Sequence, residues 1–205
     1  MSSQTKERHF EAYIEQTLLR VGWGRLDASA WDQDRAVFPN EAIRFIQATQ
    51  PELWEQMRRL HGAQLEDKLI AVLCKELDLK GTLAVLRHGF KFFGKTFRLA
   101  YFQPAHGLNP DILELYARNT LSISRQIPCH PGKHDAIDMV MSLNGLPVAT
   151  CELKNPVTGQ TWRSAVMQYK RDRDARAPLF TFKRRALVHF AVDTEEVWMT
   201  TRLAG

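Results

Sequence analysis

The chain has 205 residues, which is the length of one domain or of one domain with a modest extension. Hydrophobic residues make up 44% and charged residues 25% of it, and this composition excludes a chain that is mainly disordered. No apolar run approaches the ~18–20 residues of a membrane span, and the N-terminus has no apolar signal segment. Three cysteines without a CxxC pair argue against a disulfide scaffold, so a cytoplasmic location is expected.

The hydrophobic pattern changes along the chain from a helical period to an alternating one. Apolar residues recur every three to four positions at first, whereas alternation predicts strands from residue 82 onward. In chain order we expect helices over 5–21, 51–60 and 65–77, strands over 82–87 and 96–102, a short helix from 110, strands over 121–128, 136–143 and 146–154, a helix over 161–173, and strands over 186–192 and 197–201.

This order of elements predicts an α/β fold, an α+β mixed sheet with a helical N-terminal portion. We expect a single domain over 1–205, in which 1–80 is mainly helical, 81–110 is a β-hairpin and 111–205 is the core. No repeat and no composition break suggests a flexible linker.

One segment, from Gly89 to Thr96, fits the phosphate-loop pattern G-x-x-x-x-G-K-[ST] letter for letter. That pattern works through small residues whose backbone N–H groups wrap a phosphate at the start of a helix. Here the wrapping positions hold Phe90, Phe92 and Phe93, and an alternating strand follows. The segment therefore predicts a β-hairpin with Gly94 in its turn, and ATP is not expected to bind this chain.

The most informative stretch is 136–154, where Asn144-Gly145 separates two apolar strands. The first strand carries Asp138, and the second carries Glu152 and Lys154. Facing carboxylates repel each other unless a cation lies between them, and carboxylate oxygens favour Mg²⁺ or Mn²⁺. A lysine two residues along shares the face of the glutamate, which gives the groups needed for phosphodiester hydrolysis. A surface ion pair on an exposed strand is the alternative interpretation.

The pairing register tests this interpretation. A plain two-residue turn would place Asp138 opposite Cys151, whereas one extra residue places Asp138 opposite Glu152. The hydrophobic pattern favours the second register, so we expect an odd-length loop or a one-residue bulge. In that register one face gathers the apolar side chains of both strands, which are Ile137, Met139, Met141, Leu143, Pro147, Ala149, Cys151 and Leu153.

A basic segment follows this hairpin. Residues 155–185 contain eight Lys or Arg and two Asp, a net +6 in a chain of net charge +5. Such clustering suggests a polyanionic partner, and a solvated helix face is the alternative. Within the helix over 161–173, Lys170, Arg171 and Arg173 are the expected DNA phosphate contacts.

Other polar groups carry weaker signals. Gln168 lies beside the apolar stripe of the helix over 161–173, within reach of a metal-bound water or a phosphate oxygen, or simply faces solvent. Glu11 and Glu15 on the first helix are possible further acids of a metal site, although a solvated helix face is the simpler interpretation. Cys129, His130 and His134 lack the fourth ligand of a zinc site.

With these residues in view, the chain resembles the N-terminal nuclease region of the R (restriction) subunit of type I restriction–modification enzymes. The stretches that carry the likeness are FIQATQPELW, GTLAVLRHGF, RQIP, IDMVMSLNGLPVATCELKNP, QYKRDRDARAPLF and ALVHFAVDTEEVWMTTRLAG. The resemblance implies a PD-(D/E)xK restriction-endonuclease-like core over 111–205.

By this resemblance Asp138 and Glu152 would hold Mg²⁺, with Mn²⁺ as a substitute, Lys154 would complete the catalytic trio, and Gln168 would be an auxiliary catalytic residue. Many relatives carry a tyrosine four positions after this glutamine, but here that position is Asp172. Tyr169 is therefore given no role.

The resemblance implies a Mg²⁺-dependent endonuclease domain that cuts double-stranded DNA in the restriction of foreign DNA, in a complex with specificity and methyltransferase subunits. Related subunits continue into an ATP-driven motor. We expect that motor to be absent here and ATP to act only on the full-length subunit. The alternatives are a non-catalytic DNA-binding and assembly module, or a repair or junction nuclease with the same core.

Overall fold

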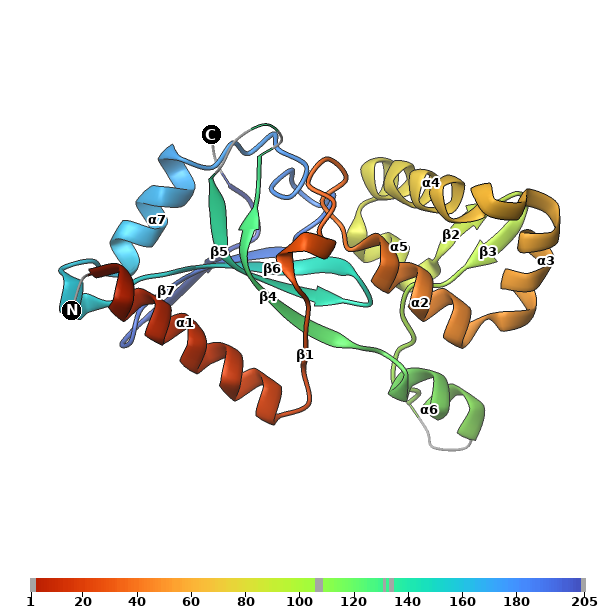
Figure 1. Ribbon diagram of the computed structural model, residues 1–205, viewed down its shortest axis with the longest axis horizontal. Helices are drawn as coiled ribbons and strands as arrows, with labels where there is room; N and C mark the ends of the chain where they lie inside the picture. The colour runs from red at the N-terminus through yellow and green to blue at the C-terminus, as the bar shows by residue number, and fades with distance from the viewer. Residues whose placement is uncertain (1–2, 106–108, 131, 133–134, 204–205) are drawn as a thin grey trace.

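The computed structural model describes residues 3–105, 109–130, 132 and 135–203. Its central feature is a six-stranded mixed sheet, with a group of helices beside it (Figure 1). The helices are α1 (Ser3–Arg20), α2 (Pro39–Thr49), α3 (Pro51–His61), α4 (Leu65–Lys80), α5 (Thr82–His88), α6 (Pro110–Ala117) and α7 (Trp162–Arg171). The strands are β1 (Gly24–Arg25), β2 (Phe90–Phe92), β3 (Lys95–Phe97), β4 (Leu121–Pro128), β5 (Ala136–Leu143), β6 (Leu146–Leu153), β7 (Val188–Val192) and β8 (Val197–Thr200).

The sheet has the order β1-β4-β5-β6-β7-β8. Strands β4, β5 and β6 form an antiparallel meander, and β7 then pairs with β6 in parallel after the crossover helix α7. The expected α/β class with a helical N-terminal portion is confirmed. Among the described residues, no helix combines the length and the apolar character that crossing a bilayer requires.

Helices α1 and α7 cover opposite faces of the sheet. Cys151 and Leu153 of β6 pack with a cluster that includes Phe10 and Ile14 of α1. Thr150, which directly precedes Cys151, is hydrogen-bonded to Tyr169 of α7, and successive residues of a strand point to opposite faces. The end of β6 therefore lies between two helices, which is where the predicted site residues are.

The register of the β5–β6 hairpin is the one that places the two acids together. Leu143 pairs with Leu146 across a two-residue turn, and a bulge then shifts the register so that Met139 pairs with Cys151. Continuing this register brings Asp138 opposite Glu152. The expected one-residue bulge is thus confirmed.

The turn of this hairpin also fastens the helical portion to the sheet. Asn144 and Gly145 have positive φ values of 50° and 84°, as a two-residue type I′ turn requires. Gly145 accepts a hydrogen bond from the backbone N–H of Phe38, just before α2. A Cβ on Gly145 would lie 2.6 Å from the Phe38 carbonyl oxygen, so this close approach requires glycine.

The predicted division of apolar residues between the faces is wrong at Ile137. Met139, Cys151 and Leu153 pack together toward α1 as expected, but Ile137 packs with Val140 and Tyr169 in another cluster. Gln126, which lies opposite Asp138 in β4, has a φ of +52°, and such a left-handed residue interrupts the strand alternation. The two strands therefore change faces at Gln126 and Asp138.

The strand predicted over Thr82–Arg87 is wrong, because this segment is helix α5. Its buried residues Thr82, Val85 and Leu86 have the spacing of three and four that one face of a helix shows. In a segment of only seven residues, this spacing is easily mistaken for the alternation of a strand. The expected hairpin around Gly94 is confirmed as β2 and β3, although β3 ends at Phe97 and not at residue 102. The phosphate-loop match therefore lies in a hairpin whose Phe90 and Phe92 are buried.

Candidate active site

Asp138 is half-buried at the point where β4 and β5 change faces, and both of its carboxylate oxygens accept hydrogen bonds. The backbone N–H of Leu153 donates to its Oδ2 at 2.7 Å, and the side-chain amide of Gln126 donates to its Oδ1 at 3.3 Å. Among the described residues no cationic side chain pairs with it. Its position is therefore fixed by neutral donors, and its negative charge is not compensated by an ion pair.

Glu152 is completely buried on the α7 side of β6. Burial and the charge of Asp138 raise the pKa of its carboxyl to about 8, although Arg173 opposes the shift. The Nε of Arg173 donates to one oxygen, Oε1, at 2.7 Å, and its Nη2 forms an ion pair with the same oxygen at 2.6 Å. The other oxygen, Oε2, has no hydrogen-bond partner among the described residues.

Lys154 follows two residues later and is 8% exposed. Its backbone N–H donates to Val192 at 2.8 Å, which extends the parallel pairing of β6 and β7 beyond the end of β6. Its ammonium lowers the pKa of Glu152, so the two groups share one electrostatic environment, yet no ion pair or hydrogen bond of this side chain occurs among the described residues. An ammonium without an anionic partner, on a residue that is largely buried, suits a site that receives an anion.

These residues fit a divalent cation. A buried carboxylate oxygen without a donor, next to a second carboxylate, is the donor set that Mg²⁺ and Mn²⁺ prefer. Asp138 and Glu152 are the two residues of this site that would hold such an ion, because Lys154 carries no acceptor.

Helix α1 contributes acids that the sequence did not place in the interior. Glu11 and Glu15 are 4% and 6% exposed, so the interpretation as a solvated helix face is wrong. Glu11 accepts from Arg125 at 2.7 Å and from Gln126 at 3.0 Å, and the same Gln126 amide reaches Asp138. The pKa of Glu11 is raised by burial, and the charge of Asp138 adds to the shift. The signal in the sequence was Arg125, the one charged residue of β4.

Helix α7 brings two kinds of residue toward this face. Tyr169 is buried, and its hydroxyl is 2.8 Å from Thr150, which in turn lies 2.8 Å from His189 Nδ1. This network anchors the helix to β6 and β7. Gln168 is half-buried, and no hydrogen bond of its side chain occurs among the described residues, so its auxiliary role stays a prediction.

The basic segment 155–185 does not form one continuous surface. Lys170 and Arg171 at the end of α7 are exposed, as a phosphate contact requires. Arg173 and Arg185 are 6% and 2% exposed and are used inside the fold, where Arg185 pairs with Asp78. The expected DNA contact at Arg173 is therefore replaced by an interior contact with Glu152.

Cys129, His130 and Asp135 come within 4.8 Å of one another, whereas His134 lies outside the described residues. Both ring nitrogens of His130 are already engaged, Nδ1 with Asp135 and Nε2 as the acceptor from the N–H of Asp174 at 2.8 Å. Burial raises the pKa of the Cys129 thiol to about 12, so a thiolate ligand is disfavoured. These contacts support the sequence argument against a zinc site here.

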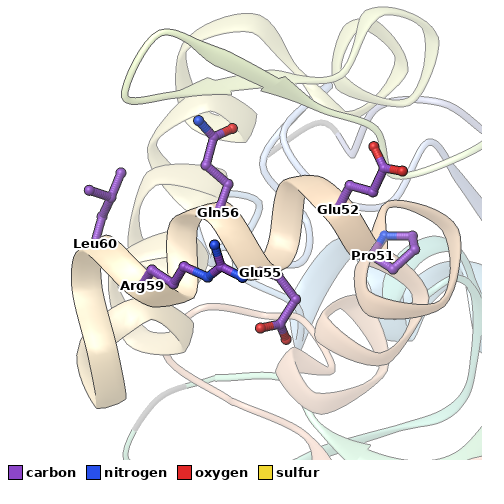
Figure 2. Close-up of a pocket in the computed structure, with 6 residues that line it drawn as sticks. All are labelled: Pro51, Glu52, Glu55, Gln56, Arg59 and Leu60. Carbon is purple, nitrogen blue, oxygen red and sulfur yellow. The ribbon is translucent and has the colours of Figure 1, made fainter.

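A hollow lies on the helical portion, away from these groups. Figure 2 shows its lining side chains along α3, which are Pro51, Glu52, Glu55, Gln56, Arg59 and Leu60. All six lining residues come from this single helix. The predicted site residues lie around the end of β6 and not in this hollow.

Comparison with known proteins identifies one family. The family model described as "Type I restriction enzyme R protein N terminus (HSDR_N)" matches residues 4–205. No curated protein matches the chain.

Proposed function

Since the chain belongs to the family of type I restriction enzyme R protein N termini, we propose that it is a metal-dependent endonuclease domain acting on double-stranded DNA. The observation that carries this proposal is the buried Oε2 of Glu152, which has no donor and lies in the field of Asp138. A buried carboxylate with one free oxygen destabilises the fold unless a cation binds it. We infer that Mg²⁺, or Mn²⁺ in its place, is that cation.

Asp138 and Glu152 would hold the ion between β5 and β6. When bound, a divalent ion polarises a phosphate oxygen and lowers the pKa of a coordinated water. The chain's part is to fix the position of both carboxylates. The Leu153 N–H does this for Asp138, and the Arg173 guanidinium does it for Glu152.

Lys154 would stabilise the negative charge that grows on the phosphate as the phosphodiester bond breaks. Its residue is 8% exposed, and its ammonium has no partner among the described residues, so the ammonium is available to a substrate oxygen. An ammonium shielded from water interacts more strongly with an anion than one on the surface does. Lys170 and Arg171 would bind the DNA backbone, and Gln168 would assist from α7.

The complex that such a domain serves would supply DNA sequence recognition. We propose that specificity and methyltransferase subunits of a type I restriction complex select the DNA, because among the described residues no element has the form of a base-reading module. This chain would then contribute phosphodiester hydrolysis in the restriction of foreign DNA.

The test is nicking of supercoiled plasmid by the purified chain with Mg²⁺, Mn²⁺ or chelator. Asp138→Asn and Glu152→Gln keep the size of each side chain and remove its charge. Each should lower metal-dependent nicking by at least about a hundredfold, because each removes a charged ligand of the ion. Glu195→Gln, an exposed carboxylate in the β7–β8 turn, is the matched control and should nick as the wild type does.

Equal nicking by wild type and Glu152→Gln would refute the site. A folded wild type that never nicks, yet binds duplex DNA equally with metal and with chelator, would favour the non-catalytic DNA-binding module. Steep salt dependence of that binding would then assign it to surface cations such as Lys170.

A further inference from the structure

The contact between Arg173 and Glu152 has an unusual form. An arginine usually meets a carboxylate with two parallel hydrogen bonds, one to each oxygen. Here Nε donates to Oε1 at 2.7 Å and Nη2 lies 2.6 Å from the same oxygen, whereas Oε2 accepts no hydrogen bond among the described residues. The guanidinium thus fixes the carboxylate through one oxygen and leaves the other one available.

Arg173 is itself held from other directions. Its Nη2 donates to the carbonyl oxygen of Ala136, at the start of β5, at 2.7 Å. Its Nη1 lies 3.6 Å from a carboxylate oxygen of Asp135, which also contacts His130. His130 in turn accepts the N–H of Asp174 at 2.8 Å, which fixes the backbone next to Arg173. The guanidinium therefore has little freedom to turn.

We propose that Arg173 is a positioning residue that orients Glu152 so that Oε2 is presented to the divalent cation. This inference rests on the proposed function, since it names what holds one of its metal ligands. Arg173 also links β5 to β6, because the same guanidinium contacts both Glu152 and Ala136. Ala136 lies two residues before Asp138. One side chain thus sets the relative placement of the strand segments that carry both acids.

The alternative role for Arg173 is a direct DNA phosphate contact, as the basic sequence around it suggests. The side chain is 3% exposed, and its donors point to Glu152, Ala136 and Asp135. A phosphate would have to displace these acceptors. The neighbours Lys170 and Arg171 are exposed and suit that role, so the two kinds of cation can be separated by experiment.

The test measures Mn²⁺ affinity by calorimetry and duplex-DNA affinity in chelator, on the full 205-residue chain. Arg173→Gln should weaken Mn²⁺ binding by about 10- to 100-fold, as removal of a residue that orients a metal ligand does. Its DNA affinity in chelator should stay within about twofold of the wild type, because the side chain is buried. The double variant Lys170→Ala/Arg171→Ala should bind Mn²⁺ as the wild type does and should lose DNA affinity in chelator.

Two further variants separate positioning from general damage to the fold. Arg185→Gln removes another buried arginine, which pairs with Asp78, and should lower thermal stability without changing Mn²⁺ affinity. Arg173→Lys keeps the charge but cannot donate to Glu152 and Ala136 in the same fork. It should recover part of the lost Mn²⁺ affinity, and it carries the comparison if Arg173→Gln does not fold.

Two results would overturn this inference alone while the wild type still binds Mn²⁺. One is a Mn²⁺ affinity of the folded Arg173 variants that equals the affinity of the wild type. The other is a loss of DNA affinity in chelator as large as the loss in the Lys170/Arg171 double variant. A wild type that binds no Mn²⁺ would instead overturn the proposed metal site, and the inference with it.

Discussion

Replacement of Glu152 by glutamine should stabilise the metal-free chain, and the gain should grow with pH. The folded state raises the pKa of this carboxyl from 4.5 to about 8, through burial first and through Asp138 second. A raised pKa means that the folded chain holds the proton more tightly than the unfolded chain does. The stability from this group is therefore complete below pH 4.5 and is lost as the pH rises toward 8.

The size of the effect follows from the two pKa values. At about 1.4 kcal/mol per pKa unit, the shift from 4.5 to about 8 corresponds to on the order of 5 kcal/mol. The amide that Glu152→Gln introduces has no proton to lose in this range, and its oxygen can still accept from Arg173. The difference in the free energy of unfolding between variant and wild type should therefore rise across this range and level off above pH 8.

Urea unfolding in chelator, at half-unit steps from pH 4.5 to 9, measures this difference. All other titrating groups are common to both proteins, so they largely cancel. Glu195→Gln is the control and should show no pH-dependent gain, because its side chain is exposed. A variant whose advantage is constant with pH, or largest in acid, would show that Glu152 is not the buried acid inferred here.

Three further outcomes are expected. Gly145→Ala should cost at least about 2 kcal/mol in urea unfolding, because φ is +84° and its Cβ would lie 2.6 Å from the Phe38 carbonyl oxygen. Burial lowers the pKa of His189 to about 4, so wild-type stability should fall as the pH drops from 6.5 toward 4, and His189→Asn should flatten that fall in thermal melts. Lys154→Met replaces an unpaired ammonium on a largely buried residue with an apolar group, so it should raise the melting temperature, yet abolish plasmid nicking; unchanged nicking would exclude Lys154 from catalysis.

Sequence reasoning was sufficient for the hairpin that carries the site. Asn-Gly fixes a tight turn, and the two apolar strands tolerate only the register that keeps Met139 and Cys151 on one face. Both signals are local, since they depend on residues close together in the chain. The bulge and the register that pairs Met139 with Cys151 could therefore be inferred from the sequence alone.

The missed features depend on contacts that are distant in sequence or on single backbone angles. Arg173 looks like its neighbours Lys170 and Arg171 in the sequence, and only the fold brings it to Glu152. Glu11 is paired with Arg125, which lies 114 residues away. The change of faces at Gln126 follows from one positive φ in a residue type that rarely adopts it, which no hydrophobic pattern encodes.

The charged groups without a partner at the end of β6 indicate which ligands the site would bind. Arg125 neutralises Glu11 from one side of the sheet, and Arg173 binds one oxygen of Glu152 from the other. At the described end of β6 this leaves the carboxylate of Asp138, the free oxygen of Glu152 and the unpaired ammonium of Lys154. A cation at the two acids and a phosphate at the lysine would give all three a partner, whereas either one alone would not. Metal and DNA should therefore bind with positive coupling, and Mn²⁺ affinity should rise when duplex DNA is present.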